Sequence, residues 1–240
     1  MTSEMSANPV ATVVLVHGAW HGAWAWERLT PFLRKSGVRY ATVELPFTGL
    51  MDDIRATRHA IEAVRGPVLL VGHSYGGSVI GAAGDHPDVR GLVFVAAKVV
   101  RAGEPQDLEG DRLPPGHVSV LTPELIAAIR TLQDGTTTIA PHRAHEVFYN
   151  GQAAEDTVTA IARLRPVSRA CATETPDACA WDSLPTTYIV CERDRALPPA
   201  VQKAYAARLK GETIRLPTSH SPFWSRPELL GAEIVRRLPR

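Results

Sequence analysis

Residues 67–77 read Pro-Val-Leu-Leu-Val-Gly-His-Ser-Tyr-Gly-Gly, and the fold can be inferred from this segment outward. Pro67 to Val71 is an apolar run typical of a buried strand, and the small residues from Gly77 to Gly84 favour a helix. Between them lies a Gly-x-Ser-x-Gly pattern centred on Ser74. A strand that turns so sharply into a helix strains the backbone of the serine, and the flanking glycines remove Cβ atoms that would clash. The pattern therefore predicts a nucleophile elbow with the Ser74 hydroxyl at its tip.

On both sides of this motif, short apolar runs alternate with helical patterns. Strands are expected at Thr12–Val16, Val38–Leu45 and Val89–Ala97, and helices at Trp26–Lys35 and Asp52–Arg65. Such an alternation indicates a parallel sheet with helices on both of its faces.

The alternation stops after residue 97 and resumes near residue 184. Residues 98–183 contain a Pro/Gly-rich start and no convincing buried strand; their helical runs are Pro123–Leu132, Pro141–Tyr149 and Asp156–Leu164. Beyond them, strands are expected at Thr186–Cys191 and Thr213–Leu216, and helices at Pro198–Leu209 and Pro222–Leu238. We therefore predict an α/β fold with a mainly parallel sheet of about six strands. Residues 1–97 and 184–240 form its core, and residues 98–183 form a mostly helical cap inserted after the fourth strand.

The composition excludes several classes of function. The chain has 240 residues, a formal net charge of +1 and no run of Lys or Arg, so we expect neither nucleic acid nor a membrane as a partner. No apolar stretch approaches the roughly 18–20 residues that cross a bilayer. Residues 1–9 are polar and lack the apolar segment of a signal peptide, which predicts a cytoplasmic protein.

Cysteines and histidines form no pattern that indicates a metal or redox site. Cys171, Cys179 and Cys191 are expected to be reduced thiols, with a disulfide between the first two as the less favoured alternative. His142 and His145 have a spacing that can chelate a metal, but no carboxylate completes the pattern. We therefore expect no metal and no cofactor.

The residues that would activate Ser74 are expected after the two later strands. A serine hydroxyl needs a base within hydrogen-bond reach, and that base needs a third group to fix its tautomer. Such groups gather where parallel strands end. Glu192 and Asp194 follow one of these strands, and His220 follows the other. We predict His220 as the base and favour Asp194 over Glu192 as the acid, because the loop after Asp194 would aim it at His220.

An oxyanion needs two backbone donors near the serine. One is the N–H of Tyr75, the residue after the nucleophile, and the other should come from the loop after the first strand. That loop begins His17-Gly18-Ala19-Trp20. Since Gly18 lets the backbone approach closely, we assign the second donor to Ala19 and place Trp20 in the wall of the pocket.

Three motifs of the chain resemble one family of small enzymes. The motifs are His17-Gly18-Ala19-Trp20-His21-Gly22-Ala23-Trp24, Gly72-His73-Ser74-Tyr75-Gly76-Gly77 and Thr218-Ser219-His220-Ser221-Pro222-Phe223. They are similar to those of the plant methylesterase and hydroxynitrile lyase group of α/β-hydrolases, most of all to its bacterial esterase branch. Phe148-Tyr149-Asn150 also resembles that branch, and the resemblance runs from residue 12 to residue 238.

The resemblance implies an α/β-hydrolase fold and hydrolysis of carboxylic esters through an acyl-enzyme, without a cofactor. It assigns the nucleophile to Ser74, the base to His220 and the acid to Asp194. The oxyanion donors would be Ala19 and Tyr75. The pocket for a small, largely apolar ester is expected to include Trp20, His73 and Phe148.

The same machinery leaves other outcomes open. A lyase is disfavoured because Ser221 rather than a lysine follows His220, Ala19 replaces a threonine, and no positive charge is expected nearby to stabilise a leaving cyanide. An acyl-enzyme that meets another acceptor instead of water would make the protein an acyltransferase or a cyclase. A non-catalytic receptor on this scaffold is the third alternative. The expected partner is a small-molecule ester, and a homodimer is compatible with the chain.

Overall fold

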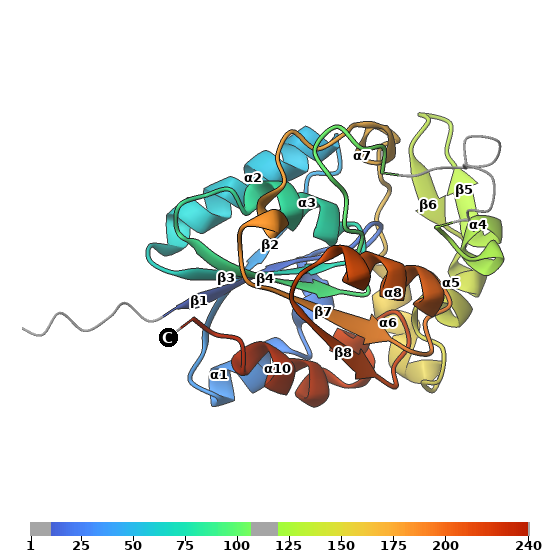
Figure 1. Cartoon of the computed structure of the whole chain (residues 1–240). Coiled ribbons are helices and arrows are strands. Elements are labelled where there is room, and N and C mark those ends of the chain that lie inside the picture. Colours follow the sequence, from blue (N-terminus) through green and yellow to red (C-terminus); the bar gives the residue numbers. More distant parts are fainter. Residues whose placement is uncertain (1–10, 107–119, 240) are drawn as a thin grey trace, which may run out of the picture.

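The computed structural model describes residues 11–106 and 120–239 of the chain. Its centre is a six-stranded sheet in the order β2-β1-β3-β4-β7-β8, in which all neighbouring strands are parallel (Figure 1). The strands are β1 Thr12–Val16, β2 Arg39–Val43, β3 Val68–His73, β4 Val89–Val95, β7 Thr186–Cys191 and β8 Glu212–Leu216. The predicted α/β class and the parallel sheet are confirmed.

Helices cover both faces of this sheet. One face carries α2 (Leu50–Val64), α3 (Gly76–Ala83) and α8 (Pro199–Arg208), and the other carries α1 (Thr30–Lys35), α9 (Pro222–Ser225) and α10 (Pro227–Val235). In β1, Val14 and Val16 pack in the first apolar layer, whereas Val13 and Leu15 pack in the second. The strand is buried along its whole length for this reason, and its sequence is a continuous apolar run.

The turn from β3 into α3 is the tightest part of the core. A Cβ atom on Gly76 would lie 2.7 Å from the backbone oxygens of Val16 and His17. A Cβ on Gly77 would lie 2.3 Å from the backbone oxygen of Lys98. Glycines at these two positions therefore let the helix pass directly against the loops that follow β1 and β4.

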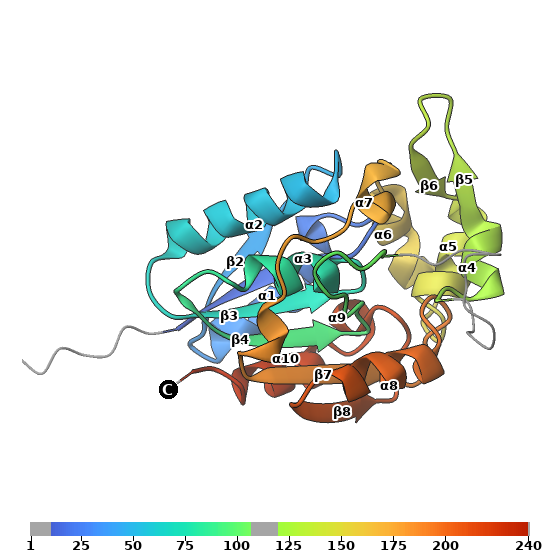
Figure 2. The same ribbon diagram turned by 45° about the horizontal axis from the view of Figure 1, so that its top comes forward.

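Residues 98–183, which we call the cap segment, lie between β4 and β7. Their described elements are α4 Pro123–Ala128, β5 Ile129–Thr131, β6 Thr137–Ile139, α5 Pro141–Phe148, η3 Glu155–Thr157, α6 Val158–Ala162, α7 Ala170–Thr173 and η4 Ala180–Asp182. Figure 1 and Figure 2 both show α4, α5, β5 and β6 beyond the carboxyl ends of β3 and β4. Whether the cap segment is a domain of its own stays a prediction.

The cap segment contains a β-hairpin that we did not predict. The helix expected over Pro123–Leu132 ends at Ala128, and β5 then pairs antiparallel with β6. The turn between them has Gly135 at φ +81°, with its N–H bonded to the carbonyl of Leu132. Asp134-Gly135 before a β-branched run is a hairpin signal, and it outweighs the helical propensity of the preceding residues.

Other predicted helices are divided in the structure, and the one expected over Asp156–Leu164 is η3 followed by α6. The helix expected over Pro222–Leu238 is α9 followed by α10, because Arg226 has φ −145° and ψ 58°, outside the helical region, and the next residue is Pro227. The helix expected over Trp26–Lys35 is a 3-10 turn, η1 Ala23–Trp26, followed by α1.

Other expectations concern a signal peptide, membrane-spanning helices, the cysteines and metal ligands. The predicted absence of a signal peptide rests on residues 1–9, and much of the Pro/Gly-rich start of the cap segment falls in 107–119; both lie outside the described residues. No described helix has the length and apolar character needed to cross a membrane. Cys171, Cys179 and Cys191 are free thiols. Within 11–106 and 120–239, no three His, Cys, Asp or Glu side chains cluster as metal ligands.

The packing of α3 predicts opposite effects for two of its glycines. Gly77→Ala should lower the free energy of unfolding by about 1–3 kcal/mol, because its Cβ would overlap backbone that has little room to move. Gly81→Ala, one turn later, meets Trp181 at 3.4 Å, an ordinary contact, and should be neutral or stabilising by up to about 1 kcal/mol. Urea unfolding of both variants checks this, and equal destabilisation would contradict the packing argument.

Candidate active site

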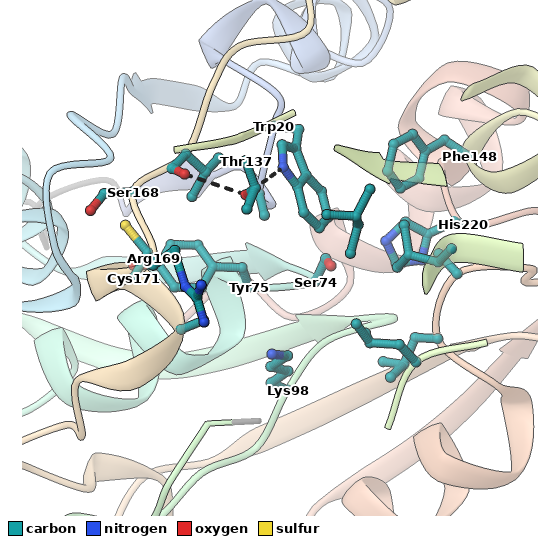
Figure 3. A pocket seen from close by; sticks show the side chains of 18 residues that line it. Trp20, Ser74, Tyr75, Lys98, Thr137, Phe148, Ser168, Arg169, Cys171 and His220 are labelled. Carbon is teal, nitrogen blue, oxygen red and sulfur yellow. Dashed lines mark hydrogen bonds between the residues drawn. The ribbon is translucent and has the colours of Figure 1, made fainter. Parts of the chain in front are cut away.

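Ser74 lies at the end of β3 with a strained backbone. Its φ is +53°, in the left-handed region that residues with a Cβ rarely adopt. Its N–H donates to the carbonyl of Val95 at 3.1 Å, and its carbonyl accepts the N–H groups of Gly77 and Lys98, each at 3.0 Å. Bonds to the neighbouring strand, the following helix and the cap segment thus hold the strained conformation. The Ser74 side chain points into a cavity (Figure 3).

His220 faces the same cavity from the loop after β8. Its Nδ1–H donates to Oδ2 of Asp194 at 2.6 Å, and both side chains are almost fully buried. Because Nδ1 carries the proton of this bond, Nε2 is left with a lone pair. Glu192, the alternative acid, has an exposed side chain. The structure therefore joins Asp194, and not Glu192, to His220.

Asp194 is fixed by further donors around its carboxylate. Its Oδ1 accepts the N–H groups of Ala196 and Leu197 at 2.7 and 2.9 Å. Its Oδ2 accepts Nε2 of Gln202 on α8 at 2.8 Å, in addition to His220. These bonds satisfy a buried carboxylate and set the direction in which it meets the imidazole.

The loop after β1 comes into direct contact with the elbow at Gly18. A Cβ on Gly18 would lie 2.8 Å from Cβ of Ser74 and 2.7 Å from Nδ1 of His73. The next residue, Ala19, lines the cavity together with Ser74 and Tyr75. In the described part of the chain, no hydrogen bond occupies the backbone N–H of Ala19 or of Tyr75.

Two buried histidines orient the peptides of this loop. Nδ1–H of His17 donates to the carbonyl of Gly18 at 3.0 Å, and Nε2 of His17 accepts the N–H of Leu45 at 3.1 Å. Nδ1–H of His21 donates to the carbonyl of Ala19 at 2.9 Å. In a trans peptide the N–H points away from the carbonyl, so fixing the Gly18 carbonyl also fixes the N–H of Ala19.

These imidazoles are neutral at pH 7. Burial lowers the pKa of His17 to about 3 and that of His21 to about 4. Burial also lowers the pKa of His73 well below its ordinary value. Each ring therefore has one N–H donor and one lone pair; for His21 the lone pair on Nε2 accepts the hydroxyl of Tyr149 at 3.0 Å. Tyr149 follows α5, so this bond ties the loop to the cap segment.

Two of the three predicted pocket residues line the cavity. Trp20 and Phe148 are among its walls, and Trp20 is held with φ +61° by a bond from the N–H of Arg165 to its carbonyl at 2.7 Å. His73 was placed in the pocket incorrectly. Its ring is fully buried under the site and donates Nε2–H to the carbonyl of His220 at 2.8 Å.

Sequence reasoning missed two cations in the cavity wall. Lys98 and Arg169 line it, so the expectation that no positive charge lies nearby is wrong. In Figure 3 both lie across Ser74 from His220, which is not the position of a lysine that follows the histidine. The available signal for Lys98 was its position just after the end of β4, whereas no local pattern indicated Arg169, which lies in the cap segment far along the chain.

A buried carboxylate beneath the cavity was also missed. Asp53 of α2 accepts the hydroxyl of Tyr75 at 2.6 Å, the N–H of Phe47 at 2.9 Å and the thiol of Cys171 at 3.6 Å. Burial raises the pKa of Asp53 and raises that of Cys171 to about 12, so the thiol stays protonated. The available signal was the helical spacing, which puts Asp53 on the same stripe as Leu50 and the other buried residues of α2.

The chain matches a known protein family over most of its length. Residues 13–233 match the family described as "Alpha/beta hydrolase family". The chain is 39% identical over 109 residues to a carbendazim hydrolyzing esterase of Nocardioides sp.; the match covers 40% of this chain and 45% of that enzyme. It is 29% identical to methylesterase 18 of Arabidopsis thaliana, covering 90% of this chain and 93% of the relative.

A solved structure shows the same fold. It is a pyrethroid hydrolase from Sphingobium faniae, which is 25% identical and superposes with a TM-score of 0.78. The superposition covers 95% of this chain and 96% of that one.

The buried histidines predict how stability depends on pH. The unfolded chain binds protons at these rings below about pH 6.5. Folded His21 does so only near pH 4, so its contribution to stability is complete above pH 6.5 and is lost as the pH falls towards 4. The free energy of unfolding should therefore decrease from pH 6.5 to pH 4. His21→Asn, which keeps a donor near Nδ1, should reduce this slope by about one proton, or ~1.4 kcal/mol per pH unit.

Urea unfolding between pH 4.5 and pH 7.5 measures the slope. His59→Asn is the matched control, since His59 is exposed on α2 and should leave the slope unchanged. A slope that His21→Asn does not alter would show that His21 is protonated in the folded protein.

Proposed function

The chain belongs to the alpha/beta hydrolase family and is an ester hydrolase, and we propose that it cleaves small carboxylic esters with Ser74, His220 and Asp194 as a catalytic triad. The observation that supports the proposal is that the groups needed for ester cleavage border one cavity. A strained serine, a histidine with a free Nε2 and two unoccupied backbone N–H groups all border it.

In the acylation step, Nε2 of His220 would take the proton of Ser74 as Oγ attacks the ester carbonyl. The carboxylate of Asp194 holds the ring in the Nδ1–H tautomer and stabilises the imidazolium that forms. The same proton then passes to the alkoxide, and the C–O bond breaks to release the alcohol. Ser74 is left as an acyl-enzyme.

Deacylation would use the same groups on water. His220 accepts a proton from the water that attacks the acyl carbon, and returns it to Oγ of Ser74 as the acid leaves. The N–H groups of Ala19 and Tyr75 would stabilise the tetrahedral oxyanion in both steps, and one such donor is worth roughly 3–4 kcal/mol.

The cavity supports small, largely apolar esters as substrates. Its volume is about 110 Å³, and Trp20, Phe148 and several aliphatic side chains form most of its wall. Esterases and a pyrethroid hydrolase among its relatives are consistent with this class. The proposed steps use only side chains and backbone groups of the chain together with water.

Ser74→Ala tests the nucleophile. It should lower kcat for a short 4-nitrophenyl ester by a factor of roughly 10⁴–10⁶, because the variant lacks the hydroxyl on which the acyl-enzyme would form. Ser78→Ala on α3, which removes a buried hydroxyl that does not line the cavity, is the matched control and should stay active. Hydrolysis by the Ser74 variant at the wild-type rate would end the proposal.

Tyr149→Phe tests the bond that steadies the oxyanion loop. Loss of the hydroxyl leaves Nε2 of His21 without its donor, so the peptide after Ala19 should become less fixed. We expect kcat to fall about twofold to tenfold with little change in KM, since Tyr149 does not line the cavity. Tyr40→Phe, which removes a surface hydroxyl bonded to Arg34, serves as control. An unchanged kcat would show that the bond between Tyr149 and His21 does not affect the proposed oxyanion donors.

A further inference from the structure

The cavity has two chemically different ends with Ser74 between them. Figure 3 shows His220 and Phe148 on one side of the serine and Lys98 and Arg169 on the other. Phe148 belongs to one apolar cluster with Leu121, Leu125 and Ile129, which also line the cavity. The other side is lined by both cations together with Cys171 and Ser168. An ester bound across Ser74 would therefore meet the aromatic ring of Phe148 at one end and the guanidinium of Arg169 at the other.

The position of His220 decides which half of an ester enters which end. If His220 hands its proton to the leaving oxygen, the alcohol must lie on the His220 side of the tetrahedral carbon. The ring of His220 stacks on Phe148 with centroids 5.7 Å apart, so that side is the apolar end. The acyl chain must then extend in the opposite direction, towards Arg169.

The acyl end carries positive charge at its surface. Among the described residues that line the cavity there is no Asp or Glu. The nearby carboxylate of Asp53 is fully buried and is covered by Tyr75 and Cys171, which bond to it. The side chain of Arg169 forms no hydrogen bond or ion pair with another residue of the described ranges. A guanidinium keeps its charge at every working pH, and its planar fork matches a carboxylate.

From this arrangement we propose that the acyl part of the substrate carries an anionic group, a carboxylate in the first instance, which pairs with Arg169. The inference rests on the proposed ester hydrolysis and names its substrate class as monoesters of dicarboxylic acids with an apolar alcohol. Water adds across the ester C–O bond, which yields the neutral alcohol, the dicarboxylate dianion and one proton. The anionic end stays unreacted throughout.

The test compares two benzyl esters that differ only in charge. Monobenzyl adipate and benzyl hexanoate have acyl chains of the same length, and released benzyl alcohol is measured by chromatography. Arg169→Gln should raise KM for monobenzyl adipate about fivefold to tenfold, with kcat nearly unchanged and benzyl hexanoate unaffected. Arg169→Lys should retain part of the preference, because the charge stays and the fork is lost. In 0.5 M salt the wild-type preference should shrink.

Controls separate this inference from the proposed function. Arg55→Gln, which removes an exposed arginine of α2 outside the cavity, should change neither ester. If Ser74→Ala stops both reactions but Arg169→Gln affects both esters equally, the anion site is overturned and the esterase stands. If Ser74→Ala leaves both reactions intact, the proposed function falls.

Binding gives a readout that does not need turnover. Calorimetric titration of the Ser74→Ala protein with monobenzyl adipate should show saturable binding, weakened about fivefold to tenfold when Arg169→Gln is added. Equal affinity in the two proteins would overturn the anion site whatever the activity of the enzyme.

Discussion

The site depends on a serine backbone that is unfavourable by itself. A residue with a Cβ at φ +53° costs of order 1–3 kcal/mol and persists only where its surroundings over-determine it. At Ser74 three backbone bonds, to Val95, Gly77 and Lys98, hold the conformation. Each comes from a different element, so β4, α3 and the start of the cap segment must all be in place before the hydroxyl faces the cavity.

Two buried imidazoles, those of His17 and His21, fix the backbone of the loop after β1 that faces Ser74. In water a histidine can change its charge near neutral pH, but burial keeps His17 and His21 neutral with fixed donors and acceptors. They bond to the carbonyls of Gly18 and Ala19, and so act as rigid supports for a short loop of irregular backbone. The chain thus uses histidine in two ways, as support in the loop and as the candidate base at His220.

The cap segment supplies many of the side chains that line the cavity. Its contribution is divided by chemistry: Phe148 from α5 builds an apolar wall, whereas Arg169 stands next to α7 at the other end. The core supplies the groups proposed for bond cleavage, at positions set by strand ends. The proposed reacting groups come from strand ends of the core, whereas the wall of the cavity combines core residues such as Trp20 with cap residues such as Phe148.

The alternation of strands and helices along the chain, the elbow at Ser74 and the candidates after β7 and β8 could be predicted from the sequence, because periodicity, glycine placement and strand ends are local properties. Three other features became known from the fold alone: Asp194 rather than Glu192 meets His220, His73 lies under the site, and Arg169 lines the cavity. These outcomes depend on the packing of segments far apart in the chain. No local pattern encodes the direction in which a side chain faces once such segments meet.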